Sequence, residues 1–123
     1  MIYRHYGNGK LYYNIGFATR FSKDFPAITI EQVGYARYTE AQTEDEKKPI
    51  KVLSVLDEKT GSKYYVYDTE VIDGLHTFYK DLSGNYWLRP RDMFFEEVSD
   101  GQPRFKKVSG EELFDIISSL MEV

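Results

Sequence analysis

Residues 87–91 place an aromatic ring, two guanidinium groups and a rigid proline side by side, as Trp87, Leu88, Arg89, Pro90 and Arg91. Pro90 fixes its own φ and pushes Arg89 into an extended conformation, so Trp87 and Arg89 should point to one side of a strand. An aromatic ring beside a guanidinium group can hold a flat or anionic ligand. The spacing therefore predicts one wall of a binding pocket.

Other arginines and aromatic residues are expected to complete this pocket. A predicted hairpin joins Thr77–Lys80 to Tyr86–Leu88 through the polar turn 81–85, and it brings Tyr79 close to Trp87. The arginines would neutralise an anionic group while the rings stack on the ligand. The predicted ligand-binding residues are Trp87, Arg89, Arg91, Tyr79, Arg104, Arg4 and His5.

The same segment also fits a purely structural interpretation. In this interpretation Trp87 fills the hydrophobic core, and Arg89 is tied to a neighbouring carboxylate such as Asp92 or Glu96. A buried guanidinium needs an anionic partner in either case. The identity of that partner therefore separates the two interpretations.

The sequence lacks the motifs of common enzyme classes. It has no Gly-x-Ser-x-Gly elbow, no Walker-type phosphate loop and no His-Glu-x-x-His. Its two histidines, His5 and His76, are far apart, and it has no cysteine for a thiolate or zinc site. We therefore expect no catalytic residue, no metal site and no cofactor, and a binding role is favoured over an enzyme.

Composition narrows the classes of partner. The 123 residues fit one domain, and no apolar run approaches the length of ~18 residues that a membrane span needs. The absence of cysteine and of an N-terminal apolar segment predicts a cytoplasmic protein without membrane attachment. A net charge of −4 argues against direct nucleic-acid binding. Both a monomer and a homodimer are compatible with the sequence.

Short strand-like runs between polar turns predict a mainly β (α+β) fold. Aromatic residues make up 16% of the chain, which suits strands better than a helical bundle. Runs at this spacing indicate a strongly bent antiparallel sheet or a small SH3-like barrel. The predicted strands, besides the hairpin above, are Lys10–Phe21, Ala27–Val33, Tyr35–Tyr38, Ile50–Leu56, Lys63–Asp68, Met93–Val98 and Arg104–Val108.

One charged segment lies between the predicted strands. Thr39–Pro49 is charged and has almost no apolar residue, so it is predicted to be an exposed acidic loop. Within it, Glu44, Asp45 and Glu46 are candidates for binding a basic surface of a protein partner.

The C-terminus is predicted to form a helix over residues 110–122. Ser109 and Glu112 have capping-box spacing, and Val108 and Leu113 fit a hydrophobic staple. Apolar residues then recur at helical spacing and must be buried, either on the sheet of the same chain, which we favour, or against another subunit. These residues are Leu113, Ile116, Ile117, Leu120 and Met121.

Four blocks of sequence carry a resemblance to a known family. They are Tyr3-Arg4-His5-Tyr6-Gly7, Phe78-Tyr79-Lys80-Asp81-Leu82, Trp87-Leu88-Arg89-Pro90-Arg91-Asp92-Met93-Phe94 and Arg104-Phe105. The chain resembles the bacterial and phage domain-of-unknown-function family 1653, which reads Tyr-x-His-Tyr-Lys-Gly, Val-Tyr-x-x-Leu, Trp-Val-Arg-Pro-x-x-Met-Phe and Arg-Phe. The resemblance implies a compact, mostly β domain without an established activity.

The resemblance covers about the first twenty residues and those from Thr77 to Val108. The centre of the chain is then a long insertion, and the C-terminal helix is an addition. Asn8 and Gly9 stand where the family has Lys-Gly, although Lys10 follows directly.

Two functions follow from the sequence as hypotheses. The first is a small non-catalytic binding module that recognises an anionic ligand, such as a nucleotide, through the arginine and aromatic pocket. The alternative is a phage-type inhibitor or adaptor that binds a protein partner through the acidic loop.

Overall fold

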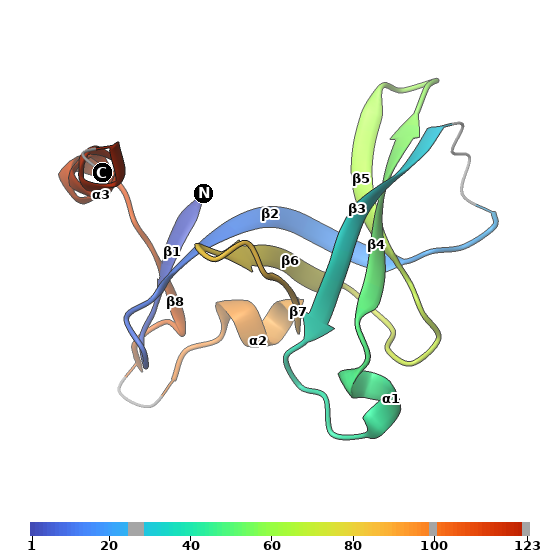
Figure 1. The fold of residues 1–123 in the computed structure, drawn as a ribbon, viewed down its shortest axis with the longest axis horizontal. Helices are drawn as coiled ribbons and strands as arrows, with labels where there is room; N and C mark the ends of the chain where they lie inside the picture. Colours follow the sequence, from blue (N-terminus) through green and yellow to red (C-terminus); the bar gives the residue numbers. More distant parts are fainter. Residues whose placement is uncertain (25–28, 99–100, 122–123) are drawn as a thin grey trace.

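The computed structural model describes residues 1–24, 29–98 and 101–121, and in them the chain forms a mainly β fold (Figure 1). The predicted fold class is confirmed, because the strands form a closed six-stranded barrel and one helix follows at the C-terminus. The strands are β1 (Ile2–His5), β2 (Leu11–Arg20), β3 (Thr29–Tyr38), β4 (Ile50–Asp57), β5 (Ser62–Asp68), β6 (His76–Asp81), β7 (Tyr86–Pro90) and β8 (Phe105–Lys107). The helices are α1 (Glu44–Lys47), α2 (Arg91–Phe95) and α3 (Gly110–Met121).

The barrel closes because β5, at one edge of the sheet, also pairs with β2. Its strands follow the order β2, β6, β7, β3, β4 and β5, and β5 pairs with β2. Most neighbours are antiparallel, as predicted. The pairings of β3 with β7 and of β2 with β5 are parallel, and the sequence analysis did not predict these two pairings.

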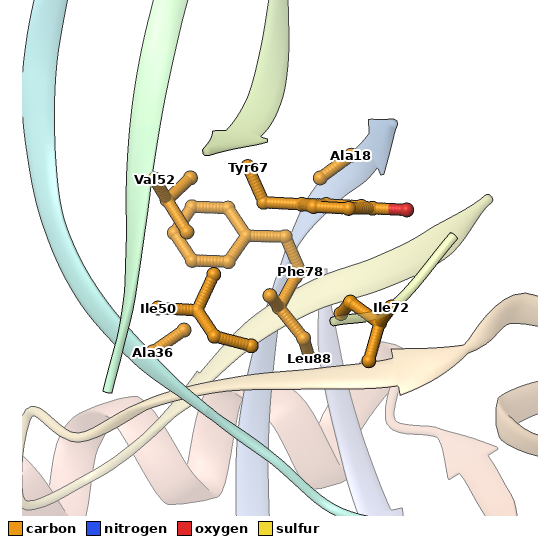
Figure 2. Packing of buried hydrophobic residues seen from close by; sticks show 8 residues of the cluster. All are labelled: Ala18, Ala36, Ile50, Val52, Tyr67, Ile72, Phe78 and Leu88. Atoms are coloured by element: carbon orange, nitrogen blue, oxygen red, sulfur yellow. The ribbon is translucent and has the colours of Figure 1, made fainter. Parts of the chain in front are cut away.

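The interior of the barrel is filled by side chains from six strands and the β5–β6 connection (Figure 2). Phe78 and Tyr67 are fully buried there, and Leu88 of β7 packs with them. Side chains alternate between the two faces of a strand, so the residues before and after Leu88 point out of the barrel. The core residues are Ala18, Ala36, Ile50, Val52, Tyr67, Ile72, Phe78 and Leu88.

A second apolar cluster lies outside the barrel, where β1 and β8 extend the sheet beyond β2 (Figure 1). The rings of Phe94 and Phe105 stack with centroids 4.1 Å apart, and Tyr79 packs against both. Tyr3, Tyr12 and Trp87 surround them. Helix α2 contributes Phe94, so it covers this outer face of β6 and β7.

Two predicted strand boundaries are wrong. The first half of the predicted strand Met93–Val98 is part of helix α2 instead. The helix begins after Pro90 and places the Phe94 ring in the second cluster. Burial of one ring therefore outweighs the β propensity of the segment. Gly34 does not end a strand: β3 runs through it with a shift in register, and a Cβ there would lie 2.9 Å from the Tyr86 ring. Ala27, at the start of another predicted strand, lies outside the described residues.

The predicted loop 39–49 is largely exposed but contains the helical turn α1. Thr43 and Glu46 form a capping box, in which the Thr43 hydroxyl accepts from the Glu46 N–H at 3.1 Å and Glu46 Oε1 accepts from the Thr43 N–H at 3.1 Å. The loop prediction is therefore wrong for residues 44–47. The cause is a local motif, Thr-x-x-Glu, that the charge-based interpretation overlooked.

Helix α3 forms as predicted, but it does not cover the barrel (Figure 1). Phe114 is 70% exposed, Ile117 44% and Met121 80%, while Leu113 and Ile116 are half-buried. The prediction that this helix joins the core is wrong, because the closed barrel fills its own interior and α2 covers its outer face. The side chain of Leu120 and residue Glu122 lie outside the described part.

Candidate functional site

A cavity of about 210 Å³ lies on the outer face of the barrel, where β6 and β7 meet β8 and the hairpin formed by β1 and β2. Its lining contains aromatic rings, one guanidinium group and small polar side chains, and no aspartate or glutamate. The lining residues are His5, Asn8, Tyr12, Thr39, Tyr79, Trp87, Arg89 and Phe105. Four of the seven predicted ligand-binding residues are therefore brought together: His5, Tyr79, Trp87 and Arg89.

The alternation of β7 places Trp87 and Arg89 on the cavity side. Leu88 between them is fully buried in the barrel core, and its carbonyl accepts a hydrogen bond from the Thr39 N–H at 3.0 Å. This bond continues the parallel pairing of β3 with β7 and brings Thr39 to the cavity. Trp87 lies opposite Tyr79 across the β6–β7 pairing, as the hairpin predicted.

Arg89 meets aromatic groups instead of a carboxylate. Its Nε donates a hydrogen bond to the Tyr79 hydroxyl at 3.3 Å, and its guanidinium carbon lies 5.4 Å from the centroid of the Phe105 ring. Within the described chain no carboxylate forms an ion pair with Arg89, and Glu96, one of the predicted partners, binds Arg104. Among the described residues the two terminal nitrogens of Arg89 therefore have no acidic partner, and neither Asp92 nor Glu96 forms the ion pair with Arg89 that the structural interpretation predicts.

Trp87 is held at the rim of the second cluster by Asp81. Its Nε1 donates to Asp81 Oδ2 at 3.2 Å, and the ring is half-buried. Desolvation alone would raise the pKa of Asp81, but hydrogen bonds from Asn85, Trp87 and Ser83 lower it below the usual value. Asp81 thus stays charged and fixes the indole at the cavity edge.

His5 is held as a neutral ring at the other end of the cavity. Its Nδ1 accepts hydrogen bonds from the N–H groups of Gly7 at 3.0 Å and Asn8 at 3.4 Å. Burial, followed by the positive charges of Arg89 and Arg104, lowers the pKa of His5 below 6.5. Because Nδ1 is an acceptor, the proton of the neutral ring lies on Nε2, which leaves Nε2–H as its donor.

Thr39 was not singled out from the sequence, yet it carries a polar atom without a partner. Its hydroxyl oxygen is buried and makes no hydrogen bond within the described chain. Unsatisfied buried hydroxyls cost about 1–3 kcal/mol, so they are uncommon in native proteins. No local pattern marks Thr39, because it reaches the cavity only through the long-range pairing of β3 with β7.

Three predicted arginines lie elsewhere. Arg91 is exposed and lies over the Phe17 ring, with 5.5 Å between its guanidinium carbon and the ring centroid, so its expected place in the pocket is wrong. The turn into α2 at Pro90 carries it away from Arg89. Arg104 is paired with Glu96, and Arg4 donates to Glu112 at 2.7 Å and to the Gly9 carbonyl at 3.1 Å.

Two larger hollows adjoin the cavity. One, of about 450 Å³, shares His5 with it and includes Arg4 and Lys106. The other, of about 470 Å³, shares Tyr12 and Trp87 with it and includes Arg4 and Lys10. Basic side chains thus border the cavity on both sides, joined in the second hollow by Asp81, although the whole chain is acidic.

The acidic residues proposed for partner binding are engaged locally. Glu44 lies 3.6 Å from Lys47, Asp45 binds Lys48 at 3.1 Å, and Glu46 caps α1. Hydrogen bonds from the Thr43 and Gln42 backbone lower the pKa of Glu46. Two lysines therefore offset part of the charge that a basic partner would meet, and partner binding by these residues stays a prediction.

In the described ranges of the chain, no group of three or more histidine, aspartate or glutamate side chains could hold a metal ion. No helix in these ranges is long and apolar enough to cross a membrane. Comparison of the chain with family models, curated proteins and solved structures found no match. The resemblance to the domain-of-unknown-function family 1653 therefore stays a prediction.

Proposed function

We propose that this chain is a non-catalytic binding module that takes the anionic group of a small ligand into the 210 Å³ cavity. The observation that carries the proposal is Arg89, a half-buried guanidinium group whose terminal nitrogens have no carboxylate partner in the described chain. A guanidinium group of this kind binds carboxylate or phosphate through two parallel hydrogen bonds.

The other polar groups of the cavity are compatible with an anion. Neutral His5 offers an Nε2–H donor, and the Thr39 hydroxyl is free to donate. Among the described residues no aspartate or glutamate lines the cavity itself, and the carboxylate of Asp81 at its edge is engaged by the Trp87 indole N–H. Contact between Arg89 and the Phe105 ring holds the guanidinium plane in place before the ligand arrives.

The volume of the cavity bears on the kind of ligand. Pockets for whole small molecules usually measure about 300–1,000 Å³, so 210 Å³ suits an anionic group and little more. The remainder of the ligand would lie in the adjoining hollow that shares Tyr12 and Trp87, which is lined by Lys10 and Arg4 and also by Asp81. A mononucleotide has this form, with a phosphate for Arg89 and a flat base for the aromatic rings.

The test is a titration of the full chain with inorganic phosphate and with adenosine monophosphate, followed by two-dimensional NMR. We expect the indole N–H of Trp87 and the backbone N–H groups of His5 and Thr39 to shift on binding. Arg89→Ala should lose these shifts. Arg91→Ala is the matched control, because it removes the same charge two positions away from a side chain outside the cavity.

A second variant separates binding from stability. Thr39→Val removes a hydroxyl that has no partner in the described fold, so the free energy of unfolding should stay the same or rise. Affinity for the ligand should fall nonetheless. Equal binding by wild type, Arg89→Ala and Thr39→Val would refute the proposal, as would a large loss of stability in Arg89→Ala without any ligand response.

A further inference from the structure

Helix α3 is held to the rest of the protein by few contacts. Glu112 Oε1 accepts a hydrogen bond from Arg4 Nη2 of β1 at 2.7 Å, and the two side chains are 56% and 41% exposed. In the described part of the chain, no other side chain of α3 forms an ion pair or a hydrogen bond with another element. Leu113 and Ile116 are half-buried, and no described side chain of α3 is fully buried. Exposed ion pairs contribute little to stability, so α3 is weakly attached.

The start of α3 has the features of a hinge. Val108 is buried, and its N–H donates to the Ile2 carbonyl at 2.8 Å, so the chain just after β8 is fixed to β1. Gly110 has a φ of +64°, and a Cβ built there would meet no atom within 4 Å. Glycine adopts either sign of φ at little cost, and hinges lie at the ends of elements. Rotation at residues 109–110 would therefore move α3 and leave β8 in place.

The anchor of α3, Arg4, also borders the proposed ligand site. It lines both hollows that adjoin the cavity, and Lys10 accompanies it in the hollow proposed to take the remainder of the ligand. Asp81 is the one carboxylate among the described residues that line this hollow, so basic side chains outnumber acidic ones there. A second anionic group on the ligand would meet Lys10 and Arg4, and it would compete with the Glu112 carboxylate for the same guanidinium group.

We propose that α3 is an autoinhibitory arm, in which Glu112 holds Arg4 until a second anionic group of the ligand displaces it. The inference rests on the proposed function and specifies a ligand with two separate anionic groups, one for Arg89 and one for Arg4 and Lys10. A nucleoside 3′,5′-bisphosphate has this form. Weak attachment of α3 suits the role, because a ligand can shift an equilibrium only by the difference in its affinities for the two states.

Removal of the competing carboxylate should raise affinity for such a ligand. Because an exposed ion pair changes an equilibrium by up to about fivefold, Glu112→Gln should bind adenosine 3′,5′-bisphosphate about two- to fivefold more tightly in calorimetric titration. Adenosine monophosphate has one anionic group, so its affinity should not change. Glu111→Gln is the matched control, since it removes the same charge from an adjacent exposed position that has no ion-pair partner in the described chain.

Hydrogen exchange of α3 measures the movement itself. A helix of twelve residues is only marginally stable alone, so release should speed exchange of the backbone N–H groups of residues 110–121. We expect faster exchange in the complex with adenosine 3′,5′-bisphosphate and no change with adenosine monophosphate. Arg4→Gln should speed exchange without any ligand. Addition of Glu112→Gln to Arg4→Gln should then change neither exchange nor affinity, because the pair is already broken.

The possible results separate this inference from the function on which it rests. If the wild-type chain binds neither nucleotide, the proposed function is wrong and the inference with it. Binding of adenosine monophosphate that depends on Arg89, together with equal affinities of Glu112→Gln and Glu111→Gln for the bisphosphate, would overturn the inference alone. Slower exchange of α3 in the bisphosphate complex would do the same, because it would show that the ligand leaves the arm closed.

Discussion

Replacing Tyr67 by phenylalanine should change how the stability of the barrel depends on alkaline pH. Tyr67 lies at the closing seam, opposite Arg20 in the parallel pairing of β5 with β2, and its side chain is fully buried. Its hydroxyl donates a hydrogen bond to the Gly74 carbonyl. Burial, with the negative charge of Asp73 second, raises the pKa of Tyr67 to about 12.

Two opposing effects set the magnitude. At neutral pH the variant loses one hydrogen bond, which costs about 1 kcal/mol, and the Gly74 carbonyl still accepts from His76 Nδ1 at 3.0 Å. Above pH 10 the unfolded chain releases the Tyr67 proton while the folded chain keeps it, so the wild type loses stability as pH rises. The folded pKa of Tyr67 lies about two pH units above the ordinary value of 10, and this difference corresponds to about 2.7 kcal/mol of unfolding free energy. About 2.3 kcal/mol of that stability is lost by pH 12. Phenylalanine avoids this loss, so the variant should become the more stable protein above about pH 10.6.

The assay is urea unfolding at a series of pH values, followed by the fluorescence of Trp87, the only tryptophan. Lysines and the other tyrosines titrate in both proteins, so the difference between the two unfolding free energies isolates Tyr67. That difference should change sign between about pH 9 and pH 12. A difference that stays constant over this range would refute the reasoning, because it would mean that folding does not protect the Tyr67 proton.

Two further expectations concern acid stability and the location of the core. Burial is the leading cause that lowers the pKa values of both His5 and His76 below 6.5. The unfolded chain therefore binds protons that the folded chain excludes, and urea midpoints should fall as pH drops from about 7.5 to 5.5, less so in His76→Phe; a midpoint that rises would contradict this. Phe78→Ala should cost about 3–5 kcal/mol, whereas Ile117→Ala should cost less than about 1 kcal/mol in dilute solution. Equal losses in thermal or urea unfolding would place α3 in the core after all.

Local sequence patterns predicted most strands and failed where distant segments decide the structure. Alternation between polar turns is a property of a few residues, so β4 to β7 were found close to their observed bounds. Strand β1 was missed, because its four residues show no alternation and owe their conformation to pairing with β2 and β8. The parallel pairings that close the barrel join segments about fifty residues apart, and no local signal encodes them.

In the candidate site, too, local patterns predicted some residues, while others are placed by distant pairings. Trp87, Arg89 and Tyr79 belong to one hairpin, so strand period and turn length were enough to predict that they lie together. Arg91 was misplaced because its position two residues after Arg89 suggested a place in the same pocket, whereas a helix begins directly after Pro90. Thr39 enters the cavity only through the contact of β3 with β7, so its role depends on tertiary structure.

The order of strands in the barrel has a consequence for the chain as it leaves the ribosome. Strand β2 is made early, yet β5 and β6, its two partners in the barrel, come more than forty residues later. Strand β3 likewise waits for β7, whose last residue is Pro90. Until then the nascent chain displays unpaired strand edges, which are the sites where β proteins aggregate. The barrel therefore cannot close until the chain has been made through Pro90, about three quarters of its length.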